Sequence, residues 1–353
     1  MITDAYERLA EQMSALPNGF PRLPSGVEVQ LLRKIFTPEQ AHVAAALRRE
    51  VQSPAQIAGQ LGLPEAAVAA MLKEMARAEL VWMGRADKGL GFRLAPFVVG
   101  IYEAHLYQMD RESAELFERY MAEGGAAALM NMQPALQRVV PAQDSVEAES
   151  ILPYDDVKNL LLRARGFAVR DCVCRYERSL LGKACSAPMR SCLTFSDSDR
   201  PPHQNRLTQE QALAILDQTE EHGLVHTVMN TVDSVSYICN CCGCCCALLR
   251  AINTFGGTNA VARANYYAEI DAGECNSCGL CHDRCQVHAI KVDADSYSVD
   301  RARCIGCGLC VTGCPDHAAH LHALPAAGIV RPPQNFQAWE EERLARRNTG
   351  CVA

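Results

Sequence analysis

The sequence has 353 residues, 19 of them cysteine, and a formal net charge of −7 at pH 7. A chain of this length can bury two or three hydrophobic cores, so we exclude a small scaffold that depends on disulfides. The acidic charge argues against nucleic acid as the main partner and favours a protein partner, because phosphate binding usually needs a basic surface. No apolar run reaches the length of a membrane span and no basic, apolar leader opens the chain, so we expect a cytoplasmic protein without a membrane span. In that reducing compartment, cysteines serve as metal ligands or redox groups.

The N-terminal half predicts a helical arm over residues 1 to 27 and a helix-turn-helix over residues 53 to 78. Ser53 can cap the first of these two helices, Pro54 suits its first turn, and Gly62 ends it. The next segment, "LVWMGRADKGLGFRL", predicts two strands around a turn.

Residues 28 to 97 as a whole resemble a winged helix domain. That fold commonly binds DNA, yet the helix that would read bases offers mainly Ala and Glu, with Lys73 and Arg77 as its cations. We therefore favour a docking or scaffold role over sequence-specific DNA binding. Residues 98 to 150 predict amphipathic helices followed by a polar linker, "PAQDSVEAES".

Residues 151 to 264 predict a cysteine-rich cluster-binding module that contains ten cysteines. Four thiols, the number that one iron-sulfur cluster binds, come from "DCVCRYERSLLGKACSAPMRSC". Cations among them would offset the negative charge of a thiolate-rich cluster, and a solvated basic loop is the alternative. The four cysteines are Cys172, Cys174, Cys185 and Cys192, and the cations are Arg175, Arg178, Lys183 and Arg190.

The stretch "CNCCGCCC", residues 239 to 246, packs six cysteines into eight positions. Adjacent cysteines point in different directions, so we do not expect all six at one iron site. With the preceding four, they would complete two clusters and leave two thiols over, or build a cluster of unusual geometry. A reactive dithiol or buried structural thiols are the alternatives. The six are Cys239, Cys241, Cys242, Cys244, Cys245 and Cys246.

His222 and His226 lie four positions apart, which is one turn of a helix. They are candidates for metal ligation or proton transfer at one shared site, with structural histidines as the alternative. Asn230 is a further candidate of the same kind.

The strongest pattern in the sequence is a repeat of four cysteines. Residues 275 to 285 read "CNSCGLCHDRC" and residues 304 to 314 read "CIGCGLCVTGC", so every cysteine recurs 29 positions later. Each run is C-x2-C-x2-C-x3-C, which wraps the backbone around one compact site. A pair of zinc sites is the alternative, but zinc ribbons separate two CxxC pairs by a longer loop. The flanking segments "NYYAEID" and "AIKVDADSYSVD" predict short strands.

Residues 265 to 322 closely resemble the bacterial-type ferredoxins that hold two 4Fe-4S clusters. The resemblance implies that ligands cross over between the two runs. One cluster would take Cys275, Cys278, Cys281 and Cys314, and the other Cys304, Cys307, Cys310 and Cys285. Gln286 stands where that family usually has a proline, which bears on the potential of one cluster and leaves its ligands in place.

Residues 150 to 322 also resemble a group of iron-sulfur proteins of anaerobic bacteria, in which a cysteine-rich module precedes a two-cluster ferredoxin domain. That resemblance implies a redox function but does not identify a substrate. Residues 323 to 353 predict a tail with a short amphipathic helix, and Cys351 stands alone near the end. The chain thus predicts an α+β multidomain protein, with a winged-helix-like N-terminal domain, a cysteine-rich α/β module and a ferredoxin-like two-cluster domain.

Our leading hypothesis is an electron-transfer protein, or a subunit of a larger oxidoreductase complex. It would relay single electrons to a redox protein partner through two ferredoxin-type 4Fe-4S clusters and one or two further clusters upstream. The sequence has neither a Rossmann glycine fingerprint nor a P-loop, so we expect no nicotinamide or nucleotide site. An electron carrier or oxidoreductase component is favoured over a stand-alone enzyme. The first alternative is a reductase whose upstream module carries a catalytic cluster. The second is a redox-sensing, DNA-binding regulator.

Overall fold

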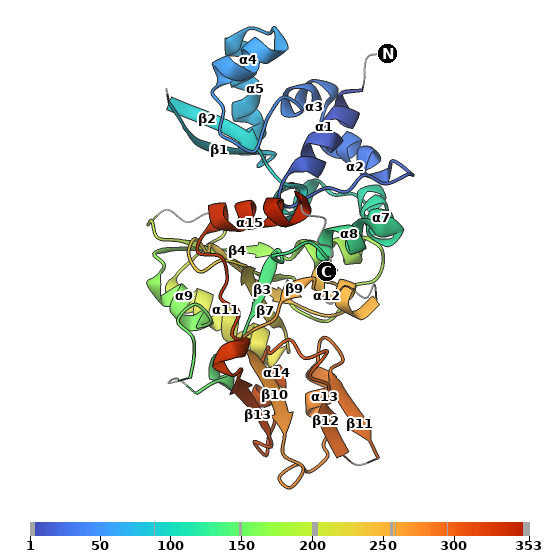
Figure 1. The fold of residues 1–353 in the computed structure, drawn as a ribbon, viewed down its shortest axis with the longest axis vertical. Coiled ribbons are helices and arrows are strands. Elements are labelled where there is room, and N and C mark those ends of the chain that lie inside the picture. The colour runs from blue at the N-terminus through green and yellow to red at the C-terminus, as the bar shows by residue number, and fades with distance from the viewer. Residues whose placement is uncertain are drawn as a thin grey trace. The chain divides into compact units, whose positions relative to one another are not determined.

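The computed structural model describes residues 4–87, 89–147, 150–199, 204–254, 257, 259–294 and 296–348. The chain divides into two compact units. Unit 1 comprises Met1–Leu129 and Glu177–Lys183, and unit 2 comprises Met130–Tyr176 and Ala184–Ala353. Both units contain helices and strands, so the fold is mixed α/β (Figure 1).

Unit 1 is mainly helical, with a β-hairpin after its fifth helix. The elements are α1 (Ala5–Ala15), α2 (Val27–Ile35), α3 (Pro38–Ala44), α4 (Pro54–Leu61), α5 (Glu65–Arg77), β1 (Val81–Ala86), β2 (Gly89–Leu94), α6 (Tyr102–Ala104), α7 (Arg111–Tyr120) and α8 (Ala126–Met130). Irregular helical turns lie among the later helices, at η1 (Phe97–Ile101), η2 (Leu106–Gln108) and η3 (Met121–Gly125).

Helices α4 and α5 form the expected helix-turn-helix. The Ser53 hydroxyl accepts a hydrogen bond from the Gln56 amide, and the Gln56 side chain accepts one from the Ser53 amide, which makes a capping box at the start of α4. Gly62 ends α4, and β1 and β2 pair antiparallel after α5. The predicted helices and strands are confirmed here, apart from residue 88 of the turn, which lies outside the described residues. Their assignment to a winged helix domain stays a prediction.

The described part of unit 2 is built on a seven-stranded sheet in the order β6-β4-β5-β8-β7-β3-β9. Neighbouring strands are antiparallel except β3 and β9, which are parallel. The strands are β3 (Gln137–Val140), β4 (Gly166–Asp171), β5 (Arg190–Ser196), β6 (Arg206–Leu207), β7 (Val225–Met229), β8 (Tyr237–Cys241) and β9 (Val261–Ala262). Strand β3 lies where the sequence predicted only helices and a linker. All four of its residues are buried, so the segment lacks the alternation of buried and exposed residues that indicates a strand.

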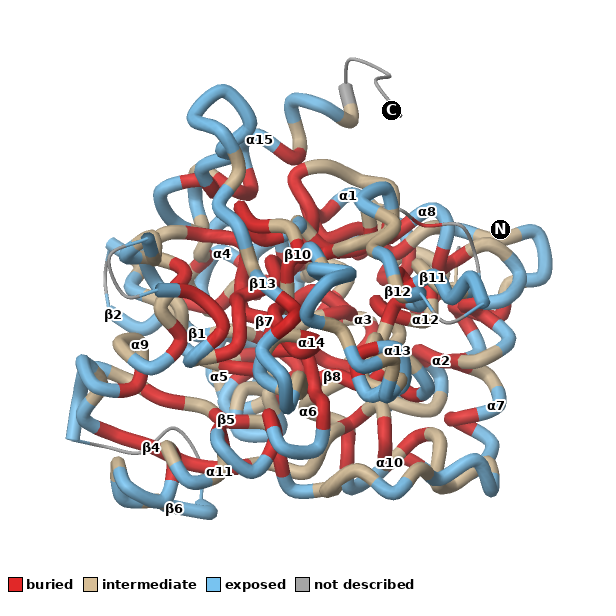
Figure 2. The backbone as a smooth tube through the Cα atoms, turned by 90° about the horizontal axis from the view of Figure 1, so that it is seen from below, coloured by how far each residue is buried: buried red, intermediate tan, exposed pale blue. Residues whose placement is uncertain are grey.

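Helices cover one face of this sheet, and thiols lie on the other. Leu193 on β5 and Ile238 on β8 belong to the core cluster that packs against α9 and α11. Because side chains alternate along a strand, their neighbours Cys192 and Cys239 point to the opposite face. Figure 2 shows β7 and most of β4 as buried. The helices of this region are α9 (Val157–Arg163), α10 (Val173–Leu180), α11 (Gln209–Glu221) and α12 (Ala247–Thr254), and η4 (Gln143–Ser145) follows β3.

The C-terminal part of unit 2 consists of two β-α-β halves that exchange strands. The first half is β10 (Tyr266–Ile270), α13 (Leu280–Arg284) and β11 (Ile290–Asp293), and the second is β12 (Ser296–Val299), α14 (Leu309–Thr312) and β13 (Ala319–Ala323). Strand β10 pairs with β13 and β11 with β12, so each two-stranded sheet takes one strand from each half. The predicted short strands are confirmed.

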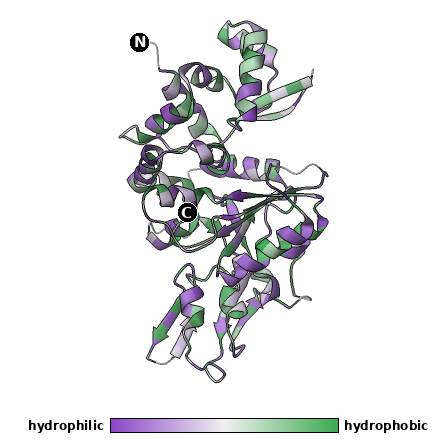
Figure 3. Cartoon of the chain, turned by 180° about the vertical axis from the view of Figure 1, so that it is seen from behind, coloured by the Kyte–Doolittle hydropathy of each residue, from purple (hydrophilic) through white to green (hydrophobic). Residues whose placement is uncertain are grey.

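The chain continues through the turn η5 (Ala326–Gly328) to α15 (Phe336–Asn348), which confirms the helix predicted in the tail. Trp339 is buried and its indole N–H donates to the Ala135 carbonyl at 2.9 Å. Cys351 lies outside the described residues. None of the described helices is long and apolar enough to cross a membrane, and Figure 3 shows hydrophobic and hydrophilic residues interspersed along them.

Candidate metal centres

The ten cysteines between residues 172 and 246 fall into two groups, and each group draws on both cysteine-rich stretches. The four-thiol group is Cys185, Cys242, Cys244 and Cys245. The six-thiol group is Cys172, Cys174, Cys192, Cys239, Cys241 and Cys246.

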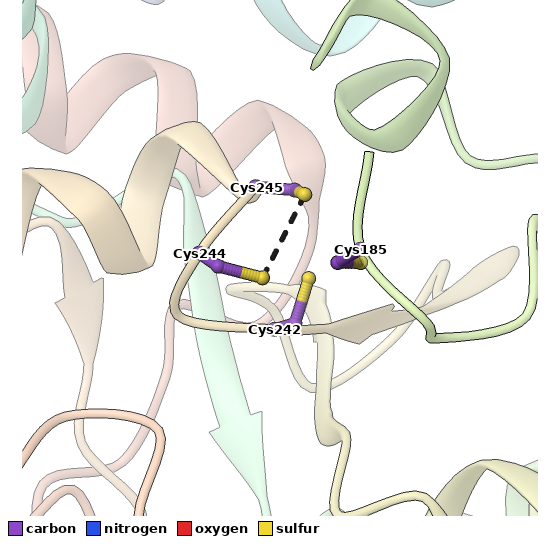
Figure 4. Close-up of side chains that lie close together, drawn as sticks. All are labelled: Cys185, Cys242, Cys244 and Cys245. Carbon is purple, nitrogen blue, oxygen red and sulfur yellow. Dashed lines mark hydrogen bonds between the residues drawn. The ribbon is translucent and has the colours of Figure 1, made fainter. Parts of the chain in front are cut away.

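The sulfur atoms of the four-thiol group all lie within 4.8 Å of one another. Three of them come from the loop between β8 and α12, and Cys185 comes from the loop between α10 and β5. Figure 4 shows the four sulfur atoms turned toward a common space, with 3.7 Å between those of Cys244 and Cys245. Cys242 and Cys245 are buried beside Leu224, whereas Cys244 is exposed.

The six-thiol group is assembled largely by the register of the central sheet. Leu193 pairs with Ile238, so the next cross-strand pair is Cys192 and Cys239. Cys241 lies two residues farther along β8, on the same face. The thiol contacts then run from Cys239 to Cys241, Cys246, Cys174 and Cys172.

Two helices begin at the six-thiol group. The Cys172 carbonyl accepts from the Tyr176 amide in the first turn of α10, and the Cys246 carbonyl accepts from the Arg250 amide in the first turn of α12. The positive ends of both helix dipoles therefore face these thiols, which favours thiolates and an anionic cluster.

Two pairs of neighbouring cysteines divide between the groups. Cys241 and Cys246 belong to the six-thiol group, and the adjacent Cys242 and Cys245 belong to the four-thiol group. The two groups are therefore separated by single peptide bonds at two points.

Arg175 is a buried cation that is fixed beside both groups. Its guanidinium donates to the Asn240 carbonyl and to the Ser191 hydroxyl, each at 2.6 Å, and to the Pro188 carbonyl at 3.0 Å. Burial alone would lower the pKa of Arg175, but the neighbouring thiols hold it above its ordinary value. Those thiols are Cys172, Cys242 and Cys241, so one charge acts on both groups.

In each group, one thiol has a pKa below its ordinary value, which favours the thiolate. A hydrogen bond from Cys239 lowers the pKa of Cys241 to about 5. A hydrogen bond from Cys245, together with the charge of Arg175, lowers the pKa of Cys242 to about 4. The thiolate is the form that binds metal, so the donor set fits iron or another thiophilic ion.

Four of the ferredoxin-like cysteines line one small cavity. They are Cys275, Cys278, Cys281 and Cys314, and Ile270, Tyr297 and Ala318 also line it. The other four are Cys285, Cys304, Cys307 and Cys310, whose thiols act on one another electrostatically. The Ala289 amide donates to the Cys285 sulfur at 3.1 Å, as backbone amides do around iron-sulfur clusters.

The second cysteine run packs closely against the segment that follows β3. The Ala142 amide donates to the Cys307 carbonyl at 3.0 Å. Gly308 has a positive φ of 74°, and a Cβ there would lie 2.1 Å from the Ser145 hydroxyl. Glycine is therefore required at this position both by the backbone conformation and by the close approach.

Gln286 connects the first cysteine run to the four-thiol group. Its side-chain oxygen accepts a hydrogen bond from the Gly243 amide at 2.7 Å, and its carbonyl accepts from the Asn253 side chain at 2.9 Å. A Cβ at Gly243 would lie 2.3 Å from that carbonyl, so the two segments touch through backbone. Proline at position 286 has no side-chain acceptor for the Gly243 amide, which gives a structural reason for the departure from the ferredoxin pattern.

The helical spacing assumed for His222 and His226 is wrong. His222 is exposed at the end of α11, whereas His226 is buried on β7, so the spacing of a helical turn does not apply. The His226 ring nitrogens lie 2.9 Å from a Glu220 carboxylate oxygen and 2.6 Å from the Asn240 side-chain oxygen. Asn230 donates to the Ala135 carbonyl at 3.1 Å.

The other predicted cations differ from Arg175 in their surroundings. Arg190 is exposed and pairs with Asp171, Lys183 is exposed, and Arg178 pairs with Glu118 in unit 1.

Two polar contacts to the six-thiol group were not foreseen. The Gln137 amide lies 3.8 Å from the Cys239 sulfur, and the Thr227 hydroxyl lies 3.6 Å from the Cys241 sulfur. Gln137 is 102 residues from Cys239 in sequence, and Thr227 reaches Cys241 across the antiparallel pair of β7 and β8.

A family model described as the 4Fe-4S binding domain matches residues 297–319, which include Cys304, Cys307, Cys310 and Cys314. The chain therefore contains a domain that binds at least one 4Fe-4S cluster. Comparisons with curated proteins and with solved structures gave no match.

Proposed function

We propose that this protein relays single electrons to a redox protein partner through two ferredoxin-type 4Fe-4S clusters and at least one further iron-sulfur cluster in the cysteine-rich module. Cluster iron changes valence without changing ligands, so a rigid cysteine cage accepts and passes one electron with little reorganisation. Unit 1 would serve as a docking or scaffold domain.

The internal repeat supports two cubane sites, although the family model covers only the second run. Positive φ values at Ser277, Gly279 and His288 recur 29 residues later at Gly306, Gly308 and His317. The exchange of strands between the halves, and the cavity that joins Cys314 to the first run, support crossed ligand sets. The proposed sets are Cys275, Cys278, Cys281 and Cys314 for one cluster, and Cys285, Cys304, Cys307 and Cys310 for the other.

The main observation in support of the relay is the contact of Gln286 with Gly243. Gln286 follows Cys285, a proposed cluster ligand, and its hydrogen bond ends between Cys242 and Cys244. One residue therefore couples the ferredoxin-like domain to the cysteine-rich module. From Gly243 the chain runs back through Cys242 to Cys241, so the same short path reaches the six-thiol group.

The test uses Gln286→Leu, which removes the hydrogen-bond acceptor and keeps the side-chain size. Anaerobic holoprotein is mixed with less than one equivalent of reductant, and electron paramagnetic resonance of rapidly frozen samples follows the spread of electrons among the clusters. We expect unchanged iron content and slower equilibration than in the wild type. Gln337→Leu, on the exposed side of α15, is the matched control.

Two results would contradict the relay. One is a wild type whose upstream thiols hold no iron, and the other is a wild type whose upstream and ferredoxin clusters never share electrons.

A cavity in unit 2 favours a reductase as the second candidate. Its volume is about 380 Å³, and its lining includes the buried ion pair of Arg138 with Asp155 at 2.7 Å, together with Asn230 and Arg263. The cavity wall adjoins the second cysteine run, because the Ala264 amide donates to the Ile305 carbonyl at 3.0 Å. The test is whether a small polar electron acceptor oxidises the reduced protein. If it does, and if Arg138→Met abolishes this oxidation, the reductase becomes the first candidate.

A further inference from the structure

We infer that Cys185, Cys242, Cys244 and Cys245 bind one tetrahedral metal ion, iron or zinc, in place of a 4Fe-4S cluster. The inference deepens the proposed function, because it assigns one of the two upstream groups. It rests on that function only for the statement that these thiols bind metal.

The separations of the sulfur atoms match a single ion. Four thiolates around one ion lie about 2.3 Å from it, so the edges of their tetrahedron measure about 3.8 Å. The Cys244 and Cys245 sulfur atoms are 3.7 Å apart, and all four atoms lie within 4.8 Å of one another. The cage therefore needs only small adjustments to close around an ion.

A cubane demands wider spacing than this. Each of its four thiolates binds a different iron atom, so the metal core itself holds the sulfur atoms apart. The protein itself provides a comparison in Cys285, Cys304, Cys307 and Cys310, which are the set proposed for one 4Fe-4S cluster, and the last three of them lie in the region matched by the 4Fe-4S family model. Among the described residues, those cysteines form no group as compact as the four-thiol group.

The local chain explains the compactness. Cys242, Cys244 and Cys245 lie on four consecutive positions of one loop, which gives their sulfur atoms little room to separate. The hydrogen bond from Gly243 to Gln286 holds that loop in place. Cys185 closes the cage from the facing loop.

The surroundings suit a tetrathiolate ion. A divalent ion with four thiolates carries a net charge of about −2, and buried Arg175 contacts Cys242 and offsets part of it. Leu224 and Ala187 pack beside the buried thiols, while Cys244 is exposed and gives an ion access from solvent. Iron and zinc share this geometry, and they differ in that iron adds a one-electron carrier whereas zinc adds only rigidity.

The experiment compares the wild type with the double variant Cys185→Ser/Cys244→Ser, both prepared without oxygen. We expect the variant to lose about one equivalent of iron or of zinc and to keep the resonance signals of the 4Fe-4S clusters. X-ray absorption of the wild type at the edge of the lost metal should show about four sulfur atoms at about 2.3 Å. Mononuclear iron would also give a high-spin ferric resonance after mild oxidation, and zinc would give none.

Cys278→Ser, at an exposed cysteine of the ferredoxin-like domain, is the matched control and should alter a cubane signal. Loss of about four irons and a cubane signal from the double variant would overturn the inference, as would full retention of metal. Metal counting requires no electron transfer, so failure of the relay and failure of this assignment are separate results.

Discussion

Arg175 shows how a single side chain can serve two groups of thiols. A lysine could not make the same contacts, because the planar guanidinium donates to Ser191, Asn240 and Pro188 from a fixed fork. In a metal centre built from these thiols, as proposed, its positive charge would stabilise the reduced, more negative state.

We expect Arg175→Met to lower the reduction potential of the upstream centre and to reduce its metal loading. The variant leaves buried acceptors without a donor, which costs about 1–3 kcal/mol of stability. Redox titration followed by electron paramagnetic resonance measures the potential, and Arg190→Met, at an exposed position, is the control. An unchanged potential would show that the charge is screened from the centre.

The proposed exchange of ligands between the two cysteine runs leads to a second prediction about single residues. Cys285→Ser should alter the cluster of Cys304, Cys307 and Cys310, and Cys314→Ser should alter the cluster of the first run. The two variants should therefore change different resonance signals, and each change should match that of a variant in the opposite run. If Cys285→Ser instead behaves like Cys275→Ser, the ligands do not cross.

At the level of elements, the sequence predicted those helices and strands that depend on signals within a few residues. The capping residue Ser53, the helix end at Gly62 and the repeated cysteine runs act over a few residues, and the structure has the helices and strands that they imply. Strand β3 was not predicted because it is fully buried, and His226 was placed on a helix because of its four-residue spacing from His222, whereas it lies on the fully buried strand β7. The division of ten thiols into groups depends on the register of β5 with β8 and on loop positions, which a single sequence does not reveal.

The two faces of β8 predict separable effects on stability and on metal content. Ile238→Val removes one methylene group from the core beneath the sheet and should cost about 0.5–1.5 kcal/mol of unfolding free energy. Metal content should stay unchanged, since Ile238 points away from Cys239. Anaerobic denaturant unfolding and metal counting on one preparation check both statements, and a loss of metal would show that the faces are coupled.

Over the whole molecule, all 18 cysteines within the described residues belong to unit 2. Metal binding to a folded site adds directly to folding stability, so the gain should be confined to that unit. Hydrogen exchange of holoprotein and of protein stripped of metal should show lost protection in the strands and loops of unit 2. Helices α1 to α5 should exchange at the same rate in both samples, and a similar loss there would mean that the units unfold together.

The division of neighbouring cysteines between two groups has a consequence for assembly. When one group closes around its metal, the bonds from Cys241 to Cys242 and from Cys245 to Cys246 also fix the backbone of residues in the other group. Fixing a residue costs about 1–2 kcal/mol of conformational entropy, and the second group no longer bears that cost. If both groups bind metal as proposed, we expect maturation of the module to be cooperative, and a limited supply of metal should yield fully loaded and empty molecules with few half-loaded ones between them.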